Sequence, residues 1–248
     1  MKVLFLLFVT SGLGLFPSLS MAQETKSGKV NYVGITAGRA FLQDLESYER
    51  NLHFSLPDVG LSDAFILGVR VGHTPQIWSR MTPIVVELEG SMITQTEAES
   101  DPFFLHPIGS TVDFTADVAV RDVMLNFCLR HPYGGIHPYA GFGLGWAWFD
   151  LENASLTLEP GFLWPETGTR VNEQGDLSED AFAYQFLLGL TFDATDTISV
   201  DLGYRYFVTE PEFKLRRTSY PEIANPVDFD IRMTMKAHVI ALGVSLWF

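Results

Sequence analysis

Six charged residues and one glutamine are embedded in otherwise apolar segments: Arg70, Glu87, Glu89, Asp122, Gln185, Asp201 and Arg205. Glu87 and Glu89 are two residues apart, and paired carboxylates serve as acid and base in glycoside hydrolysis. Opposite charges could instead pair with one another, since an unpaired buried charge costs several kcal/mol. The secondary structure that carries these side chains decides between a catalytic pair and a set of structural ion pairs.

A period of two runs through the segments that carry these residues. The clearest example is the last one, where Ile240, Leu242, Val244, Leu246 and Phe248 share one face and small residues occupy the other. A soluble edge strand could show such alternation, but a strand that faces lipid outward and a cramped interior inward fits it better. The same alternation predicts eight strands, at residues 29–41, 64–73, 83–93, 111–130, 136–151, 181–192, 197–207 and 227–248.

The connections between these strands alternate in length. Those after the second, fourth and sixth strands are short, at residues 74–82, 131–135 and 193–197. The others are long, at residues 43–63, 94–110, 152–180 and 208–226. Transmembrane barrels have short periplasmic turns and long extracellular loops. The sequence therefore predicts an all-β protein, an eight-stranded antiparallel up-and-down transmembrane β-barrel.

The first residues predict export. Met1-Lys2 is a short positive start, residues 3–16 are largely apolar, and Ser20 and Ala22 are the small residues expected before a cleavage site. We predict a signal peptide at residues 1–22, a short periplasmic segment at 23–28 and an outer-membrane barrel at 29–248. No later apolar run approaches the ~20 residues of a helical span.

Composition limits the partners. The formal net charge of −14 argues against nucleic acid or an anionic lipid surface as a partner. Cys128 is the only cysteine, so no intrachain disulfide can form. No phosphate loop or zinc-ligand spacing occurs, and we predict no cofactor, no metal and no catalytic residue.

Three segments resemble the OmpA-like porin superfamily of small outer-membrane barrels: 137–145 with a Pro-Tyr-x-Gly-x-Gly-x-Gly pattern, 182–192, and 196–206 ending in Asp-x-Gly-Tyr-Arg-Tyr. The resemblance covers the barrel domain only, and the peptidoglycan-binding domain of full-length members is not expected. It implies that the terminal Phe248 is the signal read by the barrel assembly machinery. For function it leaves open structural anchors, adhesins, small-solute channels and lipid-modifying enzymes.

An eight-stranded barrel is only about wide enough for its own side chains. We therefore expect the seven polar residues named above to form a paired plug in the lumen, with a narrow solute path as the alternative. A polysaccharide would not fit there, which argues against the glycosidase reading of Glu87 and Glu89. Trp146, Trp148, Tyr204 and Tyr206 are expected in an aromatic girdle at the membrane surface.

Lipid A deacylases of similar architecture use a His-Ser pair on the outer face, but none of the six histidines here is followed by Ser. We expect His238 and Lys236 to reach outward toward lipopolysaccharide phosphates. The long connections are rich in Asp and Glu, and they could hold divalent cations or bind an extracellular ligand. The sequence thus predicts a monomeric outer-membrane protein with a structural or surface-interaction role; a small-solute channel is the alternative, and an enzyme acting on outer-leaflet lipid is third.

Overall fold

The computed structural model describes residues 30–43, 46–49, 54–55, 59–75, 84–100, 103–105, 110–132, 134–158, 169–171, 177–216 and 228–248. Every regular element among them is a strand. No helix in these ranges is long and apolar enough to cross a membrane. The predicted signal peptide and the segment at 23–28 lie outside the described residues.

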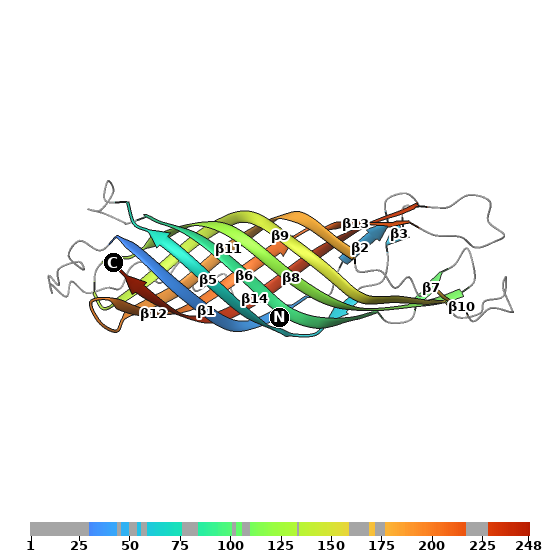
Figure 1. Cartoon of the computed structure of the whole chain (residues 1–248), viewed down its shortest axis with the longest axis horizontal. Coiled ribbons are helices and arrows are strands. Elements are labelled where there is room, and N and C mark those ends of the chain that lie inside the picture. The colour runs from blue at the N-terminus through green and yellow to red at the C-terminus, as the bar shows by residue number, and fades with distance from the viewer. Residues whose placement is uncertain are drawn as a thin grey trace, which may run out of the picture.

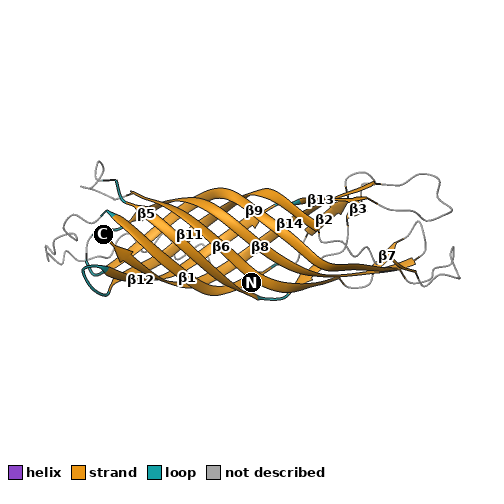
Figure 2. Ribbon diagram, in the orientation of Figure 1, coloured by secondary structure: helices purple, strands orange, loops and turns teal. Residues whose placement is uncertain are grey.

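Eight long antiparallel strands wind around one axis (Figures 1 and 2). They are β1 (Asn31–Leu42), β5 (Ala64–His73), β6 (Ile84–Ser100), β8 (Ser110–Arg130), β9 (Ile136–Leu158), β11 (Leu177–Asp193), β12 (Ile198–Thr209) and β14 (Asp228–Trp247). Each pairs with its neighbour in sequence, and β14 returns to β1. The predicted eight-stranded up-and-down barrel is confirmed.

The pairing register shows how the sheet closes. It runs from Phe41 of β1 to His238 of β14 and on through every strand, returning to β1 at Asn31. The return lies ten residues before the start (41 − 31), so the strands tilt strongly against the barrel axis, as a closed sheet requires. The tilt is visible in Figure 2.

Side chains alternate between the two faces as the period of two predicts. The outward face is apolar and exposed, with Leu67, Leu188 and Leu242 each about half exposed. The inward face is buried and holds the polar residues predicted for the lumen. An exposed apolar band around a closed sheet is what a lipid-embedded barrel presents to the bilayer.

The two ends of the barrel differ. The turn end carries the turn at 194–197, the connection between β8 and β9, and Phe248. At the other end, here called the loop end, strands project beyond the closed sheet (Figure 1). Five shorter strands pair with these projections: β2 (Glu46–Glu49), β4 (Val59–Leu61), β7 (Phe103–Leu105), β10 (Thr169–Val171) and β13 (Glu212–Arg216). A further short strand, β3 (Phe54–Ser55), pairs with β2.

These projections correct the predicted long loops. Residues 94–100 and 152–158 are strand, although the sequence analysis placed them in loops. The reason is a pair of bulges, which shift the register between Ile93 and Thr96 and between Thr115 and Asp117. A bulge changes which residues face inward, so the alternation no longer continues in phase.

The last two residues face opposite sides of the wall. Trp247 is buried in the lumen, whereas the Phe248 side chain is 60% exposed on the outer face. The Phe248 backbone N–H donates to the Asn31 carbonyl at 2.9 Å, so the chain end is paired to the start of β1. Phe248 therefore extends the pairing of β14 with β1.

Replacing Leu188 by Arg should destabilise the barrel by about 2–4 kcal/mol if this position lies near the bilayer midplane, because a charge on the lipid face must leave water. Urea unfolding of the protein refolded in phospholipid vesicles measures the change. Glu152→Arg, at an exposed site on the loop end, is the control and should change the free energy by less than about 0.5 kcal/mol. Equal tolerance at both sites would contradict the inside and outside assignment.

Deleting Phe248 should reduce insertion into the outer membrane far more than Phe248→Tyr, because deletion removes both an aromatic side chain facing outward and the last backbone pair with Asn31. The measurement is the fraction of the protein whose gel migration shifts on heating after expression in cells. Equal loss for the two variants would show that the aromatic character of the terminus is not what assembly requires.

Candidate functional site

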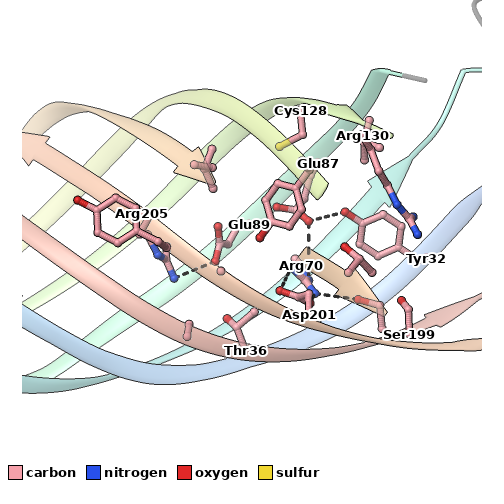
Figure 3. A pocket seen from close by; sticks show the side chains of 18 of the residues that line it. Tyr32, Thr36, Arg70, Glu87, Glu89, Cys128, Arg130, Ser199, Asp201 and Arg205 are labelled. Carbon is pink, nitrogen blue, oxygen red and sulfur yellow. Dashed lines mark hydrogen bonds and ion pairs between the residues drawn. The ribbon is translucent and has the colours of Figure 1, made fainter. Parts of the chain in front are cut away.

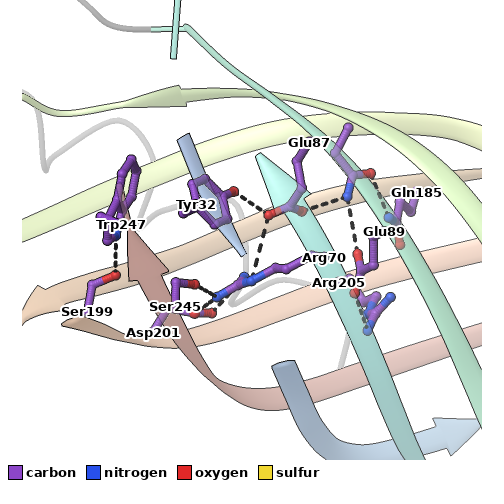
Figure 4. Close-up of polar contacts among 11 residues, drawn as sticks. Tyr32, Arg70, Glu87, Glu89, Gln185, Ser199, Asp201, Arg205, Ser245 and Trp247 are labelled. Carbon is purple, nitrogen blue, oxygen red and sulfur yellow. Dashed lines mark hydrogen bonds and ion pairs between the residues drawn. The ribbon is translucent and has the colours of Figure 1, made fainter. Parts of the chain in front are cut away.

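The seven predicted polar residues come from five strands and all point into the barrel. Arg70 lies on β5, Glu87 and Glu89 on β6, Asp122 on β8, Gln185 on β11, and Asp201 and Arg205 on β12. All are buried except Arg70, whose side chain is 11% exposed. Together with Asn126 of β8 they form a layer across the lumen that we call the charged belt. Figure 4 shows the contacts of Arg70, Glu87, Glu89, Gln185, Asp201 and Arg205 within it.

Arg70 joins two carboxylates across the lumen. Its guanidinium bonds to Asp201, with Nη1 3.3 Å from Oδ2, and its Nε lies 3.7 Å from Oε2 of Glu87. It also donates from Nη2 to the Ser245 hydroxyl at 2.9 Å. β5 and β12 are not neighbours, since β1 and β14 lie between them, so this ion pair ties together distant parts of the wall.

Small residues on the intervening strands make room for this bridge. A Cβ added at Gly243 of β14 would lie 2.7 Å from Nη2 of Arg70. One added at Gly34 of β1 would lie 3.0 Å from the Arg70 Nε. Real Cβ atoms do not approach so closely without a shift of their neighbours, so the glycines on the inner face are matched to the buried arginine.

A second ion pair and several neutral donors complete the belt. The ion pair joins Arg205 to Glu89, with Nη2 and Oε1 3.1 Å apart. The Asn126 amide donates to Glu87 at 3.0 Å and to Glu89 at 3.1 Å, and accepts from Gln185 at 2.8 Å. Two hydroxyls also donate to carboxylates: Ser91 to Asp122 at 2.5 Å, and Tyr32 to Glu87.

The belt carries more carboxylates than arginines, four against two. Hydrogen bonds from neutral groups therefore hold charge that the arginines alone do not balance. The predicted set omitted three of these donors, Tyr32, Ser91 and Asn126. All three lie on the inward face, so the alternation that identified Asp122 also marks Asn126.

A cavity of about 70 Å³ adjoins the charged belt and extends from Arg205 and Val239 to Arg130 and Trp247 (Figure 3). This volume has room for a few water molecules. Belt residues line one part of it, and the remaining wall includes Tyr139, Cys128, Arg130 and Trp247. Among the described residues, the Thr36 hydroxyl and Nη1 of Arg205 have no hydrogen-bond partner, and both residues line the cavity. Bound water would satisfy them.

Trp247 covers the turn end of this cavity. Its indole N–H donates to the Ser199 hydroxyl at 2.7 Å, and its ring lies 4.5 Å from that of Tyr32. The Arg130 guanidinium stacks 5.0 Å above the Trp247 ring and pairs with Asp193 at 3.6 Å. The sequence analysis missed this group because it considered only the small inward residues of the last strand.

Toward the loop end the lumen is apolar, which the sequence analysis did not predict. Buried side chains from most of the strands fill it in one continuous cluster. Its large members within the barrel include Ile66, Ile93, Val120, Met124, Phe149, Phe207, Met235 and Val239. The interior therefore has two levels, a charged belt with a small cavity and a section packed with apolar side chains.

The four predicted girdle residues lie on the outer face. Trp146 and Trp148 on β9 are 45% and 38% exposed, and Trp146 donates to Asp180. Tyr204 and Tyr206 lie on β12, close to the ring of His238. The four residues are thus outward-facing, and three of them touch polar partners.

A site that binds a metal ion or activates a serine needs a particular arrangement of side chains. They contain no cluster of three or more His, Cys, Asp or Glu residues placed to hold a metal ion. The outward His238 contacts Tyr204 and Gln43, at 2.7 Å each, rather than a serine. Glu87 and Glu89 lie inside the closed lumen, away from any polysaccharide-sized opening in the part described.

Comparisons with known proteins agree with this architecture. The family model described as the outer membrane protein beta-barrel domain matches residues 8–248. The outer membrane protein OprG of Pseudomonas aeruginosa is 13% identical and has a TM-score of 0.53, covering 91% of this chain and 99% of OprG. Neisserial surface protein A is 13% identical, covering 88% of this chain and 97% of that protein, with a TM-score of 0.43.

The attachment invasion locus protein Ail of Yersinia pestis is 15% identical, covering 88% of this chain and 99% of Ail, with a TM-score of 0.35. Comparison with curated protein sequences finds no match. At these identities the solved structures show the fold alone, whereas the family model spans nearly the whole chain and confirms the predicted resemblance. The chain belongs to the family of outer-membrane β-barrel proteins.

Proposed function

We propose that this protein is a closed, non-catalytic outer-membrane barrel that acts as a structural or surface-interaction protein through its acidic loop end. The observation that carries the proposal is the filling of the lumen at two levels. The charged belt is cross-linked by ion pairs and amide hydrogen bonds, and the section above it is packed with apolar side chains. An ion crossing the lumen would have to disrupt the ion pairs of the charged belt and then bring water into the apolar section.

The loop end supports the surface role. There β6, β8 and β9 continue past the bulges, and the outward side chains become acidic. Glu97, Glu99 and Glu152 are exposed, and Asp117 is half-buried. Strands hold such side chains in a fixed arrangement, which a partner can recognise at a lower entropic cost than a mobile loop.

A narrow solute path is the second candidate, favoured by the cavity that adjoins the belt. Charged residues of both signs line it, and it holds enough space for water. Carboxylates lining a continuous pore would favour cations. The sealed barrel and the solute path differ in one respect: a solute path requires that the apolar section of the lumen open to water.

Conductance in planar lipid bilayers separates the two. The purified wild-type barrel should show no steady conductance, and Glu87→Gln combined with Glu89→Gln should leave it non-conducting because the apolar section remains. A steady wild-type conductance whose cation selectivity falls in the double variant would overturn the sealed barrel and support the solute path.

Removing one partner of a belt ion pair should destabilise the barrel. Arg205→Met leaves Glu89 buried without its guanidinium, and we expect a loss of about 3–5 kcal/mol in the free energy of unfolding. Arg121→Met is the matched control, because its pair with Asp150 is on the outside and its side chain is 58% exposed. The control should lose less than about 1 kcal/mol.

Urea unfolding in vesicles gives both values. Adding Glu89→Gln to Arg205→Met should recover part of the loss, since the stranded charge is then removed. Equal losses for Arg205→Met and Arg121→Met would mean that the belt contributes no more than a surface ion pair.

A further inference from the structure

A group of polar and cationic side chains interrupts the outer face where β1, β14 and β12 lie side by side. Below it, toward the turn end, the outward residues of β14 are apolar from Phe248 to Ile240, and those of β12 include the exposed Ile198 and Leu202. Six residues then follow toward the loop end, and we call them the outer patch: Arg39, Gln43, Tyr204, Tyr206, Lys236 and His238. On β14 and β12 the outer patch thus begins where the apolar residues end, at the height expected for lipid headgroups, whereas on β1 the exposed Phe41 lies between Arg39 and Gln43.

His238 is held firmly at the centre of the outer patch. Its Nδ1 lies 2.7 Å from the Tyr204 hydroxyl and its Nε2 lies 2.7 Å from the side-chain amide of Gln43. Its ring centroid is 5.1 Å from that of Tyr206. Three adjacent strands are therefore linked on their outer faces by a fixed chain of polar groups.

Two cations flank this chain. The Arg39 side chain is 58% exposed, and its guanidinium lies 5.6 Å from the Phe41 ring and 3.0 Å from Asp63. Lys236 occupies the next outward position beyond His238 on β14. Asp63 is the one carboxylate among the described residues for which a contact with Arg39 is seen, and a half-exposed ion pair of this kind is weak.

The opposite side of the barrel shows what distinguishes the outer patch. Arg121 on β8 is also outward and 58% exposed, but it lies in an acidic setting. It bonds to Asp150, which also accepts from Ser178 at 2.9 Å, while Asp180 accepts from Trp146 nearby. Arg39 pairs with the single carboxylate of Asp63, and the groups around His238 beside it are an amide and a hydroxyl.

We propose that the outer patch binds a phosphate group of lipopolysaccharide in the outer leaflet. A guanidinium matches phosphate geometry with two parallel hydrogen bonds, and an ammonium adds a point charge. The Tyr206 hydroxyl and the Gln43 amide are neutral donors at the same height. The phosphate displaces Asp63 from Arg39 or shares the guanidinium with it.

The protein's net charge of −14 does not oppose this site. Beyond about one Debye length, roughly 8 Å at physiological ionic strength, exposed charges are largely screened. The local charge of the outer patch therefore decides which headgroup lies against this face. The site is independent of whether the loop end binds a partner.

Native mass spectrometry of the full-length barrel in detergent tests the proposal, with diphosphoryl lipid A as the added probe. The double variant Arg39→Gln, Lys236→Gln should bind the probe about tenfold more weakly than wild type, because two charge-assisted contacts are lost. Arg121→Gln, which removes one outward cation from the acidic side, should bind as wild type does. Dephosphorylated lipid A should bind wild type as weakly as the probe binds the double variant.

Three results would overturn the proposal. One is equal affinity of wild type for the phosphorylated and dephosphorylated lipids, which decides the question even if the double variant fails to fold. Another is an Arg121→Gln loss as large as that of the double variant. The third is equally tight binding of phosphatidylglycerol, which would indicate attraction for any anionic lipid. A heat-dependent gel shift checks that each variant is folded.

Discussion

A strand that crosses lipid must find a partner for every backbone N–H and C=O group, and the rest of this structure depends on that requirement. Here β14 returns to β1 and leaves no free edge within the closed part of the sheet. Closure by eight strands with a ten-residue stagger then sets a narrow lumen. The interior is consequently a place for side chains, and its chemistry is decided by what those side chains can do for one another.

Charged groups persist in this interior because their partners come from several strands. Arg70 reaches across two intervening strands to Asp201, and the glycines at positions 34 and 243 leave space for it. Tyr32 and Asn126 donate to Glu87 and Glu89, which the arginines also contact, and Ser91 donates to Asp122. The Asn126 amide joins the Arg70–Glu87 pair to the Glu89–Arg205 pair, so these residues form one connected unit.

The period of two predicted the eight strands, their up-and-down order and the inward set, because almost every strand has one lipid-facing and one lumen-facing side. It failed after Ile93 and after Leu151, where the register shifts and strand continues through residues 94–100 and 152–158, which the sequence analysis placed in loops. It also could not separate the apolar section of the lumen from the lipid-facing band. Val120 and Val123 are chemically alike, although the first is buried inside and the second faces outward.

The pairing within the belt was beyond sequence reasoning for a different reason. Which arginine meets which carboxylate depends on the stagger of the whole barrel, a property that no single strand encodes. Arg70 and Asp201 are 131 residues apart and lie on strands that are not adjacent. Even a correct set of inward residues therefore leaves the contacts undetermined until the register of all eight strands is known.

The terminal dipeptide couples two tasks that are usually considered separately. Phe248 faces outward on the seam, and Trp247 closes the lumen beneath the cavity. Because neighbouring residues of a strand face opposite sides, a shift of one position would exchange these roles. The indole would then lie in lipid, its bond to Ser199 would be lost, and the phenyl ring would enter the cavity. These two residues thus constrain the register of β14, because Phe248 faces outward only when Trp247 faces the lumen.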